Sequence, residues 1–485
     1  MFKTFFLLIF LPALIWAQVD FQKYFADSTL RIDYYHIGNQ QKELITIDQM
    51  YLQKFWAGPE TKLIDPFNNG KYYVEVFDSS EHRLLFSKGF NTYFGEYQTT
   101  EAAKKGEMRT YHETALIPWP KQPVVFKLYS RDRQNILHPI FTKKLVPGKF
   151  AFINENRAAG VRVIREHTAG GFHHCVDIAI ISEGYTKKGI IKFQKDLKRF
   201  TKVLLNKPPF SRHKNQINIY GLFKPSAEAG CDQPTQNIYR NTLLSCTFNS
   251  MGSPRYLLTE DNRTLHDVAS AVPYDALIIM VNSKRYGGGG IYNFFMDFTT
   301  DNTWSPNVMV HEFGHSFAGL ADEYYSSSTA YDEFYPPGVE PTEPNITRLL
   351  DPKNIKWKQL VDTGVPIPTP WRKALYDSLQ LSYLKGRKAF NDEIARLVRS
   401  GAPKEVVEAK RKEAAAWSKK CVGRSKNFFK EEKYYGKVGA FEGAGYVSQG
   451  MYRPMLDCVM FQNGDKPYCR VCAHRIEEII RHLTE

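Results

Sequence analysis

The feature that most constrains this chain is a run that begins His311-Glu312-x-x-His315. On an α-helix, residues four apart lie on one face, so His311 and His315 can direct their imidazoles at one metal ion. Glu312 lies about 100° around the helix from His311, close enough to take a proton from water at that ion without binding the ion itself. The run therefore predicts a helix that carries a zinc site and a general base.

The flanking residues favour a helix over this run. Ser305 suits the N-cap position, and Pro306 is preorganised for the first turn. Gly319 suits the left-handed residue that ends a helix and turns the chain back towards the metal. Apolar side chains on the intervening turns would bury the helix in a domain core: Val308, Met309, Val310, Phe313 and Phe317.

The third zinc ligand is expected after the turn. A catalytic zinc usually takes three protein ligands and keeps a fourth position for water. In metzincins the third ligand comes three residues after the motif glycine, and the residue at that distance from Gly319 is Asp322. We take Asp322 as the third ligand and Glu323 as its competitor, because this turn is one residue longer than the metzincin pattern. The alternative is a buried helix whose histidines make ordinary hydrogen bonds.

The run from His311 to Tyr324 resembles the bacterial immunoglobulin A peptidase family of zinc metalloendopeptidases (metallopeptidase family 64). Other segments that resemble it are Glu183-Gly184-Tyr185-Thr186, Tyr286 with Gly287 to Gly290, Glu343-Pro344-Asn345-Ile346-Thr347, and Tyr452-Arg453-Pro454 with Cys458-Val459-Met460. The resemblance covers roughly residue 176 to the C-terminus and includes the family's N-terminal β-domain. It implies a zinc-dependent endopeptidase with a two-histidine ligand set and a glutamate base, but it does not imply a substrate.

The N-terminal segment predicts export. Lys3 is followed by an apolar run that ends at Ala17, which is the pattern of a secretory signal peptide over residues 1–17, cleaved before Gln18. At roughly a dozen apolar residues the run is short for a membrane span, which needs about 20. We therefore expect a secreted or periplasmic, soluble protein without a membrane span.

Charge and the glycine run limit the partners. The formal net charge is +14, but the basic residues are dispersed, so we expect a solvated basic surface and no nucleic-acid partner. The run Gly287 to Gly290 lacks the Gly-Lys-Ser/Thr of a phosphate loop, which argues against nucleotide binding. In a zincin, Gly288, Gly289 and Gly290 would lie where an edge strand pairs with an extended protein substrate; the alternative is a flexible surface turn. We expect a monomer with one Zn²⁺ per chain.

The seven cysteines are an odd number. In an exported protein we expect disulfides, with Cys231–Cys246 and Cys458 with Cys469 or Cys472 as the first pairings to test. Cys469-x-x-Cys472 also matches half of a structural zinc site. A second Cys-x-x-Cys pair is absent, however, so disulfides are the favoured interpretation.

The chain divides into two expected domains. Residues 18–150 carry short aromatic and β-branched runs broken by turn residues, which predicts an all-β sandwich accessory domain. In residues 151–485, apolar strands at 176–181, 217–223 and 276–281 accompany a helical segment at 192–205, which indicates an α/β layer. The prediction is an α+β or α/β zincin (metzincin-like) catalytic domain after the sandwich. A charged segment at about 371–419 predicts a helical insertion split at residues 400–403.

Two further residue roles are expected. Met460, with Met455 as second choice, resembles the methionine turn under the ligands of metzincins, although both residues would also suit a core. Tyr452 or Tyr324 could supply a phenol that stabilises an oxyanion.

The leading hypothesis is hydrolysis of internal peptide bonds of extracellular proteins, including mucosal glycoproteins or immunoglobulin A. The rival is a non-catalytic glycan- or protein-binding surface protein that retains the zincin fold, and the intact base Glu312 argues against it.

Overall fold

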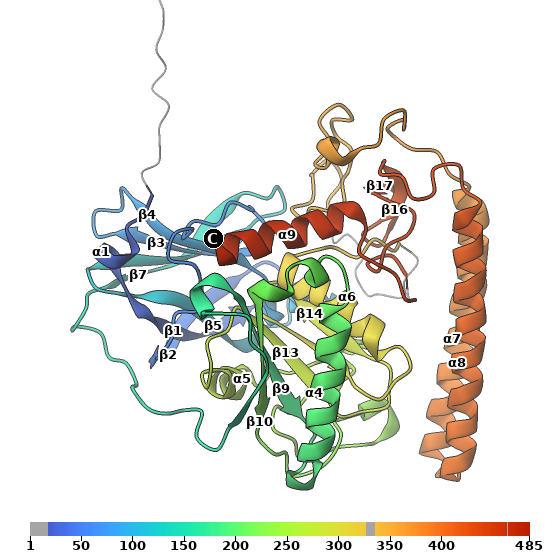
Figure 1. The fold of residues 1–485 in the computed structure, drawn as a ribbon, viewed down its shortest axis with the longest axis horizontal. Coiled ribbons are helices and arrows are strands. Elements are labelled where there is room, and N and C mark those ends of the chain that lie inside the picture. Colours follow the sequence, from blue (N-terminus) through green and yellow to red (C-terminus); the bar gives the residue numbers. More distant parts are fainter. Residues whose placement is uncertain (1–17, 326–334, 463) are drawn as a thin grey trace, which may run out of the picture.

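The computed structural model describes residues 18–325, 335–462 and 464–485. The expected signal peptide, residues 1–17, lies outside the described residues. N-terminal sheets, a central sheet flanked by helices and a long helical hairpin follow one another across the view in Figure 1. Among the described residues, no helix combines the length and the hydropathy that a membrane crossing requires.

The N-terminal region contains two antiparallel sheets. The first has the order β2 (Glu43–Gln53), β1 (Phe25–Gly38), β5 (Arg109–Pro120), and the second β4 (Leu84–Phe90), β3 (Tyr72–Asp78), β6 (Val124–Arg131), β7 (Leu137–Leu145). The short helices are α1 (Phe21–Tyr24), α2 (Tyr93–Tyr97) and α3 (Glu101–Lys104). Side chains of both sheets, such as Ile32 and Val76, belong to one hydrophobic core. The strands that the aromatic and β-branched runs of residues 18–150 predicted are therefore present and packed together.

The central sheet has six strands in the order β14-β15-β13-β9-β10-β8. Their bounds are β8 (Arg162–His167), β9 (Val176–Glu183), β10 (Ile217–Phe223), β13 (Ala276–Val281), β14 (Gly288–Ile291) and β15 (Phe295–Thr299). The inner four strands are parallel, and the edge strands β14 and β8 are antiparallel to their neighbours. β9, β10 and β13 confirm the three predicted strands, and burial on both faces explains their uninterrupted apolar runs.

The two faces of this sheet have different covers. Ile178 and Ile180 of β9 pack in one core with α4 (Ile190–Leu205), α6 (Ser305–Ala318) and α9 (Arg470–Thr484). The intervening Ala179 and Ile181 face the opposite way, because strand side chains alternate. They share a core with α5 (Asn262–Ala269) and the N-terminal sheets. The N-terminal region therefore completes the core beneath the central sheet.

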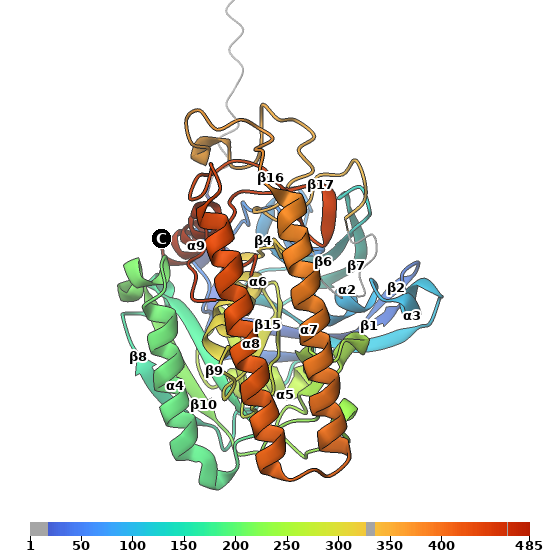
Figure 2. The ribbon, with the colours of Figure 1, turned by 90° about the vertical axis from the view of Figure 1, so that its right-hand side faces the viewer.

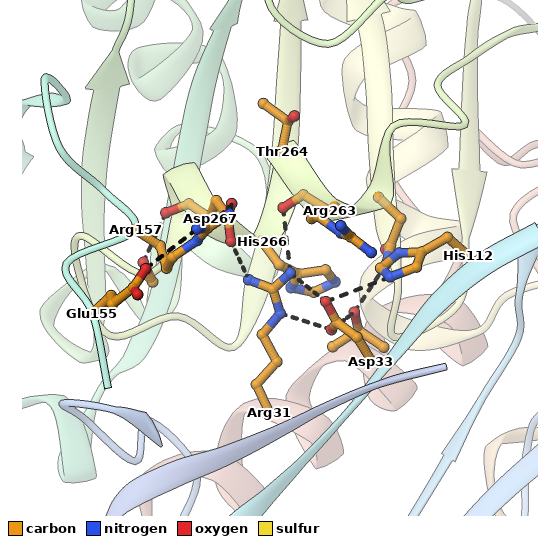
Figure 3. Close-up of polar contacts among 12 residues, drawn as sticks. Arg31, Asp33, His112, Glu155, Arg157, Arg263, Thr264, His266 and Asp267 are labelled. Carbon is orange, nitrogen blue, oxygen red and sulfur yellow. Dashed lines mark hydrogen bonds and ion pairs between the residues drawn. The ribbon is translucent and has the colours of Figure 1, made fainter. Parts of the chain in front are cut away.

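A buried polar network joins β1 to α5 (Figure 3). The guanidinium of Arg31 contacts Asp33 at 2.6 Å and Asp267 of α5 at 2.7 Å, and Arg157 also contacts Asp267 at 2.9 Å. Arg31 and Asp33 are fully buried, and a buried charge is strongly destabilising unless it is paired. The pairing therefore links the N-terminal region to α5, in addition to the hydrophobic core that the two share.

The helical hairpin stands at one side of the molecule, where α7 (Lys373–Arg399) and α8 (Lys404–Lys430) run side by side (Figures 1 and 2). The predicted break at 400–403 is confirmed, although the second helix continues to Lys430, beyond the expected end at 419. The remaining strands are the short pairs β11 (Thr247–Phe248) with β12 (Leu257–Leu258) and β16 (Phe441–Ala444) with β17 (Val447–Arg453).

Candidate functional site

Helix α6 carries the histidine run. It begins at Ser305, so this residue lies inside the helix and does not cap it, while Pro306 stands in the first turn. The helix ends at Gly319, whose φ of 58° is left-handed, as expected. The N–H groups of Gly319 and Leu320 donate to carbonyls of the last turn, and this closing pattern sends the chain back along the helix.

Three donor atoms converge beyond the helix, and we call His311, His315 and Asp322 the histidine cluster. Asp322 Oδ1 lies 3.0 Å from His311 Nε2 and 3.2 Å from His315 Nε2, and the two Nε2 atoms are 3.1 Å apart. Ligand atoms about 2.0–2.1 Å from a tetrahedral zinc are about 3.3 Å from one another. The triangle therefore has the dimensions of one face of a zinc coordination shell.

Hydrogen bonds fix the direction of the lone pairs. His311 Nδ1 donates to the carbonyl of Val459 at 2.9 Å, and His315 Nδ1 donates to that of Leu320 at 2.6 Å, so each neutral ring has its lone pair on Nε2. Asp322 Oδ1 is buried without a hydrogen-bond partner among the described residues, while Oδ2 accepts from the hydroxyl of Tyr446. Three lone pairs at one point repel unless a cation lies between them, so these residues fit a metal ion.

The electrostatics of the metal-free cluster agree with this interpretation. Burial acts to lower the pKa of His315, but the facing Asp322 outweighs it and raises that pKa to about 9. Burial acts to raise the pKa of Asp322, but His315 and His311 hold it well below its ordinary value. The cluster therefore attracts positive charge, which a proton supplies when no metal is bound.

Glu312 lies beside the cluster and outside the triangle. One of its carboxylate oxygens and the histidine donor atoms lie within 4.8 Å of one another. Burial raises the pKa of this carboxyl group. A group at this distance can exchange a proton with a molecule held at the three donors.

The glycine segment forms the edge strand β14 next to α6, and it is not a flexible turn. A Cβ at Gly290 would collide with the carbonyl of Glu312, and one at Gly288 would lie 2.7 Å from Val308 Cγ1. A Cβ at Gly289 would meet Leu258 on the opposite side. The glycines therefore let the helix lie directly on the edge strand, beside the histidine cluster.

Two cavities meet at His311. The first combines the cluster with residues from distant parts of the chain: Asn69, Asn91, Glu96, Thr100, Arg255, Tyr256, Gly290, Tyr324, Tyr335, Glu343 and Tyr446. The second contains residues of the hairpin helices: Tyr376, Gln380, Tyr383, Leu384, Arg387, Cys421, Val422 and Ser425. The donor atoms therefore lie between the N-terminal region and the helical hairpin.

The two candidate tyrosines differ in position. The ring of Tyr324 is stacked on His311 with 6.2 Å between centroids, and Tyr324 lines both cavities. Tyr452 lies in β17 opposite Thr347 and is not among the residues that line either cavity. Its hydroxyl is therefore poorly placed for the expected role, because residue type alone did not define its direction.

Sequence reasoning missed two residues of this site. The guanidinium of Arg255 lies 3.5 Å from the hydroxyl of Tyr324, and Tyr446 contacts Asp322 directly. Both residues lie in irregular segments without a recognisable motif. No signal in a single sequence identifies them.

Met460 lies against helix α6, which carries the histidines. It is fully buried, and its sulfur would lie 2.7 Å from a Cβ at Gly314 of α6. Its carbonyl accepts the N–H of Glu323 at 2.9 Å. Met455 is only partly buried. The placement of Met460 fits a hydrophobic base below the histidines better than that of Met455.

The side chain of Glu323 points away from the histidines. It forms a second group, which we call the cysteine cluster: Glu323, Cys458, Cys469 and Cys472. The Sγ atoms of Cys458 and Cys472 are 3.8 Å apart, whereas a disulfide requires about 2.05 Å. All seven cysteines are free thiols, so the expected disulfides, including Cys231–Cys246, are not formed in this structure.

Two family models match the chain. The model described as IgA Peptidase M64 matches residues 165–480, and the model described as Peptidase M64 N-terminus matches residues 20–142. A search of curated proteins found no match. The first match includes both clusters and the central sheet apart from the start of β8, and the second includes the N-terminal sheets apart from the end of β7.

Proposed function

Because the chain belongs to the IgA peptidase M64 family, we propose that it is a zinc-dependent endopeptidase of extracellular proteins. Membership in the family supports a peptidase, which acts on protein. The proposal of zinc rests on one observation, the convergence of three lone pairs from His311, His315 and Asp322 at zinc-like spacing.

The proposed architecture assigns a role to each region. Residues 151–485 would form a zincin (metzincin-like) catalytic domain, since α6 lies on the antiparallel edge strand of a largely parallel sheet. Residues 18–150 would form a β-sandwich accessory domain, which the shared core of its two sheets supports. Asn69, Asn91 and Glu96 line the cavity at the cluster, so this domain would also shape the substrate site.

In the proposed mechanism the histidine cluster would hold zinc, and Glu312 acts as the base. Zinc bound there would polarise the scissile carbonyl and make water acidic near neutral pH. Glu312 accepts a proton from the attacking water and passes it to the leaving amine. Tyr324 donates a hydrogen bond to the developing oxyanion from its place beside His311. Met460 supports the helix from below.

The edge strand β14 is the proposed substrate guide. The backbone of Gly289 and Gly290 would pair with an extended peptide next to Gly288, which already forms a β-bridge with Tyr256, and Gly290 lines the cavity with Glu312. Mucosal glycoproteins and immunoglobulin A are candidate substrates. We expect an exported protein, because Lys3 and the following apolar run have the pattern of a signal peptide.

The rival function is a glycan- or protein-binding surface protein that keeps the fold without catalysis. Glu312 argues against it, because a site that only binds has no use for a base beside the metal. Incubation with a broad peptide library separates the two functions. Internal cleavage by the wild-type protein and none by Glu312→Ala supports a peptidase, whereas equal products from both, or none from a metal-loaded wild-type protein, contradicts it.

A further inference from the structure

We propose a second metal site in the cysteine cluster, where zinc would bind tetrahedrally and have a structural role. The four donor atoms all lie within 4.8 Å of one another. Sulfurs about 2.3 Å from a tetrahedral zinc are about 3.8 Å apart, and the Sγ atoms of Cys458 and Cys472 are 3.8 Å apart. The carboxylate oxygen Oε1 of Glu323 lies 3.1 Å from Cys472 Sγ and 3.7 Å from Cys469 Sγ, close to the spacing of about 3.5 Å for a mixed pair.

Burial of these donor atoms favours a cation at this point. Glu323, Cys458 and Cys472 have no exposed surface, and Cys469 is 3% exposed. Oε1 of Glu323 accepts from Asn345 at 3.1 Å, but Oε2 has no hydrogen-bond partner among the described residues. A buried carboxylate without compensation is strongly unfavourable, and coordination of a divalent cation removes that cost.

Backbone N–H groups are directed at the sulfurs. Cys458 Sγ accepts from the N–H of Met460 at 3.4 Å and from that of Cys469 at 3.3 Å, and Cys469 Sγ accepts from the N–H of Cys472 at 3.4 Å. Cys469 also caps the N-terminus of α9, the positive end of the helix dipole. Both features stabilise a thiolate, which is the form that binds a metal.

The donor set favours zinc over a disulfide. One disulfide would use two of the three thiols, leave the third thiol unused, and leave Oε2 of Glu323 buried without a hydrogen-bond partner among the described residues. A single ion uses all four donors. Thiolates select soft or borderline metals, and the additional carboxylate oxygen suits zinc, which accepts both donor types in tetrahedral sites. A closed set of four protein donors is typical of a structural site.

The position of this site gives it a role in ordering the histidine cluster. Glu323 follows Asp322 directly, and Cys458 precedes Val459, whose carbonyl holds the ring of His311. Cys469 and the first turn of α9 come from a third segment. An ion in the cysteine cluster would therefore cross-link three segments and fix the backbone on two sides of the histidine cluster. This inference does not depend on the proposed function, because the donor atoms are different.

Metal analysis of the full chain, purified under reducing conditions without chelator, tests the proposal. We expect about two zinc ions per chain in the wild-type protein and about one in His311→Ala/His315→Ala. Cys458→Ser/Cys472→Ser should lose the ion of the cysteine cluster, while the matched control Cys421→Ser, altered in the hairpin helix α8, should keep both. A wild-type content of one ion, lost entirely in the histidine double variant, would overturn the proposal.

Cobalt substitution keeps the test decisive if the serine variant fails to fold. In the folded His311→Ala/His315→Ala protein, Co²⁺ should give a thiolate-to-cobalt charge-transfer band, because only the cysteine cluster remains. Absence of the band, or a disulfide at Cys458, Cys469 or Cys472 in peptide maps of the purified protein, contradicts the proposal. If the histidine variant instead keeps the full wild-type zinc content, the peptidase proposal fails while the second site stands.

Discussion

The histidine cluster and the cysteine cluster each contain one of two adjacent acidic residues, whose side chains point in opposite directions. Asp322 belongs to the first and Glu323 to the second, because neighbouring side chains of an extended segment alternate. The histidine cluster has three protein donors and borders two cavities. The cysteine cluster has four donors and is closed to solvent. An open coordination position suits catalysis, whereas a closed shell suits a structural ion.

The comparison also shows how the second cluster can support the first. The histidines are held by backbone carbonyls, at Val459 and Leu320, and by the chain that carries Asp322. Cys458 and Glu323 are next to two of these points. A fixed ion behind the site would therefore limit movement of the ligand segment.

The largest expected effect comes from changing the base of the histidine cluster. Glu312→Gln should reduce peptide cleavage about 10²–10⁴-fold, because the carboxylate that accepts the proton is lost. The zinc content should stay at the wild-type value, since Glu312 lies outside the donor triangle. Parallel assays of cleavage and zinc content measure both quantities, and loss of zinc together with activity would make Glu312 a ligand.

A smaller effect is expected from the hydrogen bond that supports Asp322. Tyr446→Phe removes the hydroxyl that donates to Asp322 Oδ2, and it should weaken metal binding at the histidine cluster about 10–100-fold. Titration with a competing chelator measures this affinity. Tyr452→Phe is the matched control, because Tyr452 lies outside both cavities. Equal affinities for the two variants would show that the Tyr446 contact does not position the ligand.

The affinity of the histidine cluster for metal should fall steadily as the pH is lowered. Asp322 raises the pKa of His315 to about 9 against the effect of burial, so in the metal-free chain this ring binds a proton below that pH. Protons then compete with metal, and uptake at the histidine cluster should weaken by up to about tenfold per pH unit as the pH falls below 9. Titration of the metal-free protein in a pH series, with Cys458→Ser/Cys472→Ser to isolate this cluster, measures the slope. A constant affinity between pH 6 and about 9 would contradict the assigned ligands.

The sequence predicted the parts that depend on local spacing. The helix at 305–318, its glycine end and the buried strands followed from periodicity and turn chemistry, because these depend on neighbouring residues. The meeting of Glu323 with Cys458 and Cys472 could not be predicted in this way. Those residues are brought together by the return of the chain through β17 and α9, a tertiary contact with no fixed spacing.

The cysteine prediction shows the same limit. An exported chain with an odd number of cysteines favours disulfides on general grounds, and the second Cys-x-x-Cys pair of a zinc site is absent. In the proposed site, the two donors that a second pair would supply come instead from Cys458 and Glu323. Glu323 was also the competitor of Asp322 for the place beside the two histidines. The direction of the Glu323 side chain, towards Cys472, assigns this residue to the cysteine cluster and not to the histidine cluster.

Anomalous X-ray diffraction from crystals of the full chain, recorded at the zinc absorption edge, tests the central claim most directly. The account predicts two zinc peaks, one bound by His311, His315 and Asp322, and the other by Glu323 with the three cysteines of its cluster. A single peak, or a peak at which Glu323 joins the two histidines while Asp322 points away, would contradict it.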